Sequence, residues 1–349
     1  MPALFVNSFG SLRMQPPTGG GQTDGDIAFS KAEAYFNQNK IADALDWMQR
    51  AVKLKNVHAM YRLCIEHYSG GDLVLIINYN AALEYCEEAG NSGSQPAMYM
   101  AGLIFFKQQN YSKAYDWYLR GFNEKYADAI SGLASLYLNG YFVSKNISTA
   151  RNFYESAAEG CLEYMNDIEI LDGCRKGRDK TSIPSHGRCE KQVKDILLGI
   201  HSCEATTIKD FTKYKGNKCS IDALNNLGRI YQDPRGGFRD LSTALLWYAR
   251  GAELCDPASM TSIGLLFEQD EDNIPGIRRD EEKARNWYKS GENDPAANYH
   301  LARLYEKRLT TKSIKLKSEC VKVLDLYRKA ARAGFHDAQK RLLHGGKCR

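Results

Sequence analysis

The sequence predicts an all-α protein, a right-handed α-solenoid of antiparallel helix pairs. The first observation is a bulky residue that is followed, four and five positions later, by small residues. This pattern recurs every 32 to 40 residues except across one long gap. Most of its occurrences also have an alanine three residues before the bulky residue. A fixed period of this length is typical of stacked structural repeats. The bulky residues are Trp47, Tyr85, Trp117, Phe153, Trp247, Trp287 and Leu326.

The first helix of each repeat is predicted from a second pattern upstream of the bulky residue. An alanine is followed four residues later by a Leu-Gly-like pair, and an aromatic residue comes three residues after that pair. Ala223, Leu227-Gly228 and Tyr231 show it clearly. Spacings of four and eight residues place these side chains on one helical face. The small residue in the middle of that face allows the next helix to approach closely.

The start of each second helix is predicted from a capping residue, which lies four positions before its alanine. Asn and Asp side chains accept hydrogen bonds from the unpaired amides of a helix start, and each cap contributes about 1 kcal/mol. The residues at this position are Asn78, Asn110, Asn146, Asp240 and Asp280.

These patterns divide the chain into four parts. Residues 1–25, with Pro16-Pro17 and three consecutive glycines, are expected to be a disordered tail. Residues 26–160 and 221–349 carry repeats, and the second stretch ends in a basic helix. In residues 161–220 the period fails, which predicts a divergent helical insertion or a degenerate repeat.

Two stretches of the second repeat region resemble a known repeat. Residues 236–248 contain Asp240, Ala244 and Trp247-Tyr248 in register, and residues 276–289 contain Asp280, Lys283-Ala284 and Trp287-Tyr288. Both closely resemble the Sel-1-like repeat, which is similar to the tetratricopeptide repeat. The resemblance implies an α-solenoid and a role in protein–protein interaction.

The location predicted from the sequence is cytoplasmic. The first residues lack the basic and apolar segments of a secretory signal, and no apolar run is long enough to cross a bilayer. The ten cysteines are accordingly expected to be free thiols. Among them, Cys64, Cys86 and Cys255 lie at or near predicted core positions of helices.

The sequence nominates no catalytic site and no cofactor. It has no phosphate-binding Gly-Lys-Ser/Thr loop, no Gly-x-Ser-x-Gly elbow and no His-Glu-x-x-His pair. One alternative is a zinc-dependent module within residues 161–220. His186, Cys189, His201 and Cys203 are the residues there that could supply the four ligands zinc requires. Their spacing is unlike that of a familiar zinc finger.

A partner-binding groove is expected on the concave side, which the first helix of each repeat lines. On these helices, the positions that face the groove lie three residues before and one residue after the small residue of the Leu-Gly-like pair. Tyrosine and arginine contribute strongly to interface energies, and arginine pairs well with carboxylates. We therefore expect a non-catalytic scaffold or adaptor that binds a protein or peptide. The candidate groove residues are Tyr61, Tyr99, Asn225, Arg229, Tyr299 and Arg303.

Nucleic acid is a second possible partner, because the segment from Lys307 to Arg349 is rich in lysine and arginine. Helical repeats can bind RNA with one base per repeat, but this requires the same polar pair in every repeat. The candidate groove residues differ too much from one repeat to the next for such a code, which disfavours RNA.

Overall fold

The computed structural model describes residues 23–74, 76–162, 219–236, 239–269, 278–309, 316–344 and 348. The chain divides into two compact units, each described here by itself. The N-terminal unit contains residues 23–157 of the described chain. The C-terminal unit contains nearly all of the described chain from residue 220 onward.

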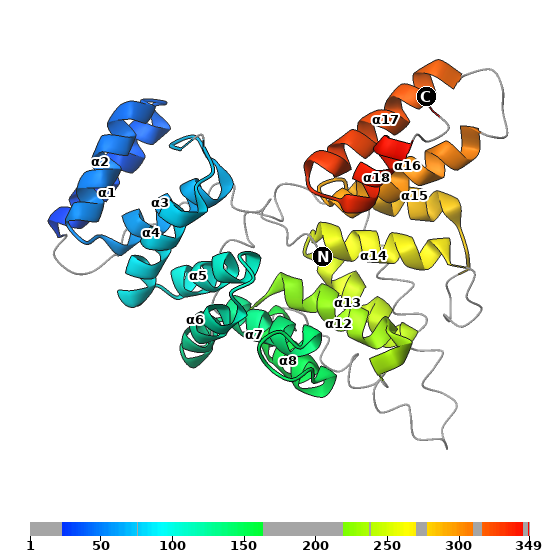
Figure 1. The fold of residues 1–349 in the computed structure, drawn as a ribbon, viewed down its shortest axis with the longest axis horizontal. Helices are drawn as coiled ribbons and strands as arrows, with labels where there is room; N and C mark the ends of the chain where they lie inside the picture. Colours follow the sequence, from blue (N-terminus) through cyan, green and yellow to red (C-terminus); the bar gives the residue numbers. More distant parts are fainter. Residues whose placement is uncertain are drawn as a thin grey trace. The chain divides into compact units, whose positions relative to one another are not determined.

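The N-terminal unit consists of successive antiparallel helix pairs (Figure 1). The helices pack in sequence, α1 on α2, α3 on α4 and α5 on α6, and the first helices of adjacent pairs also touch. Its helices are α1 (Asp24–Asn37), α2 (Ile41–Lys53), α3 (Val57–Ser69), α4 (Tyr79–Asn91), α5 (Gln95–Lys107), α6 (Tyr111–Asn123), α7 (Ala127–Asn139) and α8 (Ile147–Leu162).

The C-terminal unit repeats the same arrangement (Figure 1). In it α12 packs on α13, α14 on α15 and α16 on α17, while α18 packs on α17. Its helices are α12 (Ile221–Gln232), α13 (Leu241–Glu253), α14 (Pro257–Glu268), α15 (Glu281–Ser290), α16 (Pro295–Leu309), α17 (Leu316–Arg332) and α18 (His336–His344). Among the described residues, no helix is both long enough and apolar enough to cross a membrane.

The predicted caps of the second helices are confirmed. Each side-chain oxygen accepts a hydrogen bond from a backbone amide in the first turn of its helix. The five caps are Asn78, Asn110, Asn146, Asp240 and Asp280. The first helices have caps of the same kind, such as Asn56 at α3 and Asp256 at α14. The repeat boundaries therefore follow directly from local sequence.

The residue after the bulky anchor fills the centre of most repeats. Tyr248 and Tyr288 are fully buried, whereas the preceding Trp247 and Trp287 are slightly more exposed. Each tyrosine ring lies on the small residue of its own first helix. A Cβ added to Gly264 would lie 2.6 Å from Cε1 of Tyr288. Only glycine leaves room for that ring, since protein interiors are close-packed.

The hydroxyls of these tyrosines bond to the last turn of the first helix, at the residue four positions after the small residue. We call this the last-turn position. Tyr248 donates to Gln232 at 2.7 Å and Tyr288 to Glu268 at 2.6 Å. Tyr327 donates to Glu306 at 2.8 Å. Three successive repeats of the C-terminal unit are thus closed by the same polar contact.

The cysteines correct one expectation from the sequence. Cys64 and Cys86 form a disulfide between α3 and α4, and Cys320 bonds to Cys348. Cys255 is also disulfide-bonded. Cys64 and Cys86 occupy the positions of the glycine and tyrosine in other repeats, which the helical hairpin brings to a Cα–Cα distance of 5.3 Å. The expectation of free thiols rested on the cytoplasmic location, which stays a prediction, whereas disulfides are typical of oxidising compartments.

Two of the predicted segments fall largely outside the described residues. Of the N-terminal tail, 1–25, only the last residues are described, and α1 begins at Asp24. Of the insertion, 161–220, only residues 161, 162, 219 and 220 are described. The zinc candidates His186, Cys189, His201 and Cys203 all lie outside the described residues.

Candidate functional site

The predicted groove residues of the C-terminal unit lie on the first helices α12 and α16. Asn225 of α12 is half-buried, and its amide donates to the hydroxyl of Ser262 on α14 at 3.0 Å. Arg229, one turn further along α12, is exposed. Its nearest polar contact is with Asn226 on its own helix, at 3.5 Å. Within the described residues, Arg229 makes no ion pair, so its guanidinium is free to bind a carboxylate.

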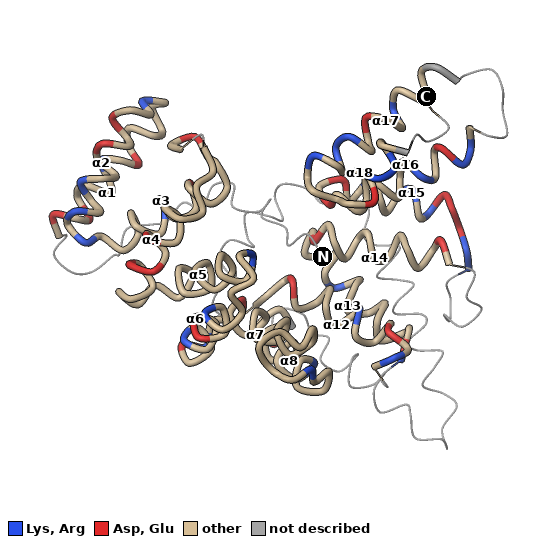
Figure 2. Tube along the Cα trace, viewed as in Figure 1, with Lys and Arg blue, Asp and Glu red and all other residues tan. Residues whose placement is uncertain are grey.

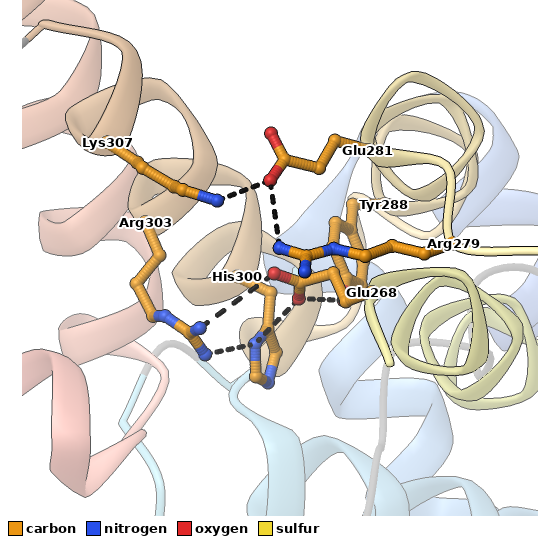
Figure 3. Close-up of polar contacts among 7 residues, drawn as sticks. All are labelled: Glu268, Arg279, Glu281, Tyr288, His300, Arg303 and Lys307. Carbon is orange, nitrogen blue, oxygen red and sulfur yellow. Dashed lines mark hydrogen bonds and ion pairs between the residues drawn. The ribbon is translucent and has the colours of Figure 1, made fainter. Parts of the chain in front are cut away.

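Arg303 belongs to a polar cluster around Glu268 (Figure 3). Its guanidinium lies 3.8 Å from the Glu268 carboxylate, and the imidazole of His300 lies 3.7 Å from the same carboxylate. Tyr288 donates to the same carboxylate from α15. The Glu268 side chain is 16% exposed, whereas that of Arg303 is 48% exposed. The Arg303 side chain therefore reaches solvent, whereas the carboxylate that it faces is largely buried.

Burial determines the protonation of this cluster. It lowers the pKa of His300 to about 4, and the nearby Arg303 cation acts in the same direction against a smaller opposing effect of Asp337. His300 is therefore neutral near pH 7, and its Nδ1 can accept from Arg303 at 3.2 Å. Burial also raises the pKa of Tyr288, followed by its hydrogen bond to Glu268. The tyrosine hydroxyl therefore stays protonated and donates.

A second group of charges lies beside this cluster (Figure 3). Glu281, at the start of α15, pairs with Lys307 of α16 and with Arg279 at 3.3 Å. The hydrogen bond from Lys307 is the main reason that the pKa of Glu281 is lowered. Both partners of Glu281 are well exposed, so this ion pair contributes little to stability.

Tyr299 packs among aromatic rings. Its ring centroid lies 5.0 Å from that of Phe335 and 5.8 Å from that of Tyr327, and it also contacts His300 edge-on. The side chain is half-buried. Tyr299 therefore holds α16 against the last repeat and presents only part of its surface to solvent.

The predicted groove residues of the N-terminal unit are also engaged in packing. Tyr61 is 5% exposed, and burial is the main reason that its pKa is raised. Tyr99 is half-buried, with its ring 6.0 Å from Tyr118 and 6.3 Å from Tyr126. Of the six predicted groove residues, only Arg229 and Arg303 are exposed.

The structure adds residues that the sequence analysis did not select. Glu268 and His300 join Arg303, and Ser262 joins Asn225. Glu268 and Glu306 stand at the last-turn position, and the arginine of the next repeat pairs with each of them. Arg341 bonds to Glu306 at 2.8 Å, as Arg303 faces Glu268. The regular spacing of these residues was the signal that could have revealed them.

Within the described residues, no group of three or more His, Cys, Asp or Glu side chains is arranged to hold a metal ion. The Glu268 and His300 side chains contact each other, Tyr288 and Arg303. This arrangement suits the binding of a polar group beside the exposed arginine.

Comparison with known proteins places the chain in a family. The model of the Sel1 repeat matches residues 57–94, 96–124, 127–160, 221–254, 257–291 and 324–335, together just over half of the chain. The chain belongs to the Sel1 repeat family, whose members are generally scaffolds for protein–protein interaction. No curated protein matches the chain significantly.

A solved structure supports the same fold. A Sel1 repeat protein from Oxalobacter formigenes is similar with 16% identity and a TM-score of 0.50, over 92% of this chain and 75% of that one. A protective antigen of uropathogenic Escherichia coli with an SLR fold has 21% identity and a TM-score of 0.38, over 93% and 73% of the two chains.

Proposed function

We propose that this chain is a non-catalytic scaffold or adaptor that holds a segment of a partner protein on the first helices of its C-terminal unit. The exposed Arg229, which has no carboxylate partner among the described residues, is the observation that carries this proposal. Asn225 and Ser262 lie beside it and offer an amide and a hydroxyl to a peptide backbone. Arg303 marks the same face two repeats further on.

The two arginines have different parts in this proposal. Arg229 is free to pair with a carboxylate of the partner. Arg303 already faces Glu268, so a partner carboxylate there competes with one of the chain's own. We therefore assign the main electrostatic contact to Arg229 and a weaker one to Arg303.

Affinity capture from native lysate tests the proposal, and a captured protein is then titrated against the purified chain. Arg229→Glu alone is expected to weaken binding by about tenfold or more, because a repulsive pair replaces an attractive one. Arg229→Glu with Arg303→Glu is expected to abolish capture. Lys289→Glu on α15 makes the same charge change on a second helix and is the matched control.

The outcome that overturns the proposal is the survival of every captured partner in the double variant, with helicity unchanged by circular dichroism. Loss of binding in the Lys289→Glu control as well as in the double variant would also overturn it. In that case net charge, and not the first-helix face, would govern binding.

Nucleic acid is less well supported as the partner. Several cations of the basic C-terminal segment face the chain's own carboxylates, namely Lys307 with Glu281 and Arg341 with Glu306. Figure 2 shows acidic residues interspersed with basic ones along the C-terminal helices. Phosphate binding would have to compete with these internal pairs. The cytoplasmic location and the zinc-dependent alternative remain predictions.

A further inference from the structure

A row of aromatic side chains follows the loops that join the two helices of each repeat in the N-terminal unit. We call it the aromatic edge, and it comprises Tyr68, Tyr79, Phe106, Tyr111, Tyr141 and Phe142, with Lys107 among them. All of these residues lie at the ends of first helices, at the starts of second helices or in the loops between them.

Ring contacts connect much of this row. Tyr68 meets Tyr79 edge-on at 5.6 Å. Tyr111 stacks on Tyr141 at 4.4 Å, and Phe106 contacts both of those rings. These contacts hold aromatic side chains from three successive repeats at one edge of the unit. Such a platform is pre-ordered and costs little conformational entropy to use in binding.

Part of the aromatic edge is exposed to solvent. Phe142 is 60% exposed and Tyr79 is 42% exposed. In the loop before Tyr79, Ile76 is 78% exposed and Ile77 is 51% exposed. Large apolar side chains that gather on a surface in this way mark interaction sites.

Lys107 places a positive charge in the middle of the row. Its ammonium lies 4.6 Å from the ring centroid of Tyr68 and 6.0 Å from that of Tyr79. It makes no ion pair with any described residue. Lys107 is exposed at the surface, and partial burial lowers the pKa of its ammonium. A partner carboxylate placed here would form an ion pair with the Lys107 ammonium.

We propose that the aromatic edge binds an extended segment of a partner protein in which an Asp or Glu stands beside a large apolar side chain. The carboxylate pairs with Lys107, and the apolar side chain lies against the exposed Tyr79 and Ile77. This surface is separate from the first-helix face of the C-terminal unit and does not depend on the function proposed for it.

Fluorescence polarisation with three labelled peptides tests the partner chemistry. The first peptide contains two Glu-Phe pairs in a Gly/Ser background, the second has Gln for Glu, and the third has Ala for Phe. The first is expected to bind at least about fivefold more tightly than the other two, and salt should weaken its binding. Equal binding of the Glu and Gln peptides overturns the proposal.

Variants of the full chain test the site. Lys107→Gln and Tyr79→Ser are each expected to weaken binding of the first peptide by about fivefold, whereas Tyr68→Phe should leave it unchanged because the Tyr68 hydroxyl is shielded from solvent. Lys53→Gln on α2 is the matched control for loss of one lysine charge and should bind normally. Arg229→Glu should also bind normally, which separates this site from the C-terminal one.

Two further outcomes would overturn the proposal. The first is unchanged binding in Lys107→Gln while circular dichroism shows a folded chain. The second is a concentration-dependent dimer in analytical ultracentrifugation that Tyr79→Ser removes. That dimer would show that the edge is covered by a second copy of the chain.

Discussion

The two units close their repeats in different ways although their helix pairs follow the same pattern. In the C-terminal unit, the last-turn position is Gln232, Glu268 or Glu306, and each accepts from a buried tyrosine. In the N-terminal unit, the same position holds Tyr68 and Phe106. One helical framework therefore supports either a polar contact or an aromatic one at the same place.

This difference changes which charges are left for a partner. In the C-terminal unit, Arg303 and Arg341 lie against the carboxylates of the preceding repeats. In the N-terminal unit, no carboxylate stands at the last-turn position of α3 or α5, and Lys107 remains unpaired among the described residues. A basic residue near the end of a first helix is therefore held by a carboxylate at Arg303 and left available for binding at Lys107 and Arg229.

The largest expected effect comes from the repeat that is closed by a covalent bond. Replacing Cys64 and Cys86 together by alanine should lower the free energy of unfolding of the N-terminal unit by about 3 kcal/mol, because the bond closes a loop in the unfolded chain. Urea titration followed by circular dichroism measures the change. Digestion without reductant should yield a peptide that contains the Cys64–Cys86 bond, and its absence would refute the assignment.

The next effect tests the polar contact of the C-terminal unit. Glu306→Leu should destabilise the protein by about 2 kcal/mol, since it strands the Tyr327 hydroxyl and the Arg341 guanidinium. Glu306→Gln should cost less, because the amide oxygen still accepts from Tyr327. The matched change at the last-turn position of α5, Phe106→Leu, is expected to cost about 1 kcal/mol. If Glu306→Leu and Phe106→Leu lower the free energy of unfolding equally, the proposed contrast between the units is wrong.

The smallest effect depends on pH. Burial places the pKa of His300 near 4 in the folded chain, below the ordinary value of 6.5, so the unfolded chain binds more protons between these values. The stability that neutral His300 contributes is present above pH 6.5 and is lost as pH falls towards 4. The stability difference between wild type and His300→Asn should shrink by about 1 kcal/mol from pH 7.5 to pH 5.5. A difference that does not vary with pH would contradict this reading.

The sequence alone determined the repeat, its helix boundaries and its family. These features are local: the caps at Asn110 and Asp280, and the alanine and tryptophan spacing around Trp287, act within one or two turns of helix. Periodicity and capping are properties of short segments, so they can be read without coordinates. The same register selected Arg229 and Arg303, but it also selected Tyr61, which is buried, so exposure did not follow from it.

Only the tertiary structure decided how residues about twenty to forty positions apart meet. It showed that Cys64 is bonded to Cys86. It also showed that the Glu268 carboxylate accepts from Tyr288 and faces the Arg303 guanidinium. In addition, it showed that Tyr61 is buried and that Lys107 lies over the Tyr68 ring, with no carboxylate of the described residues paired to it. These outcomes depend on how one helix packs against the next, because rotation about the helix axis sets which side chains meet across the interface.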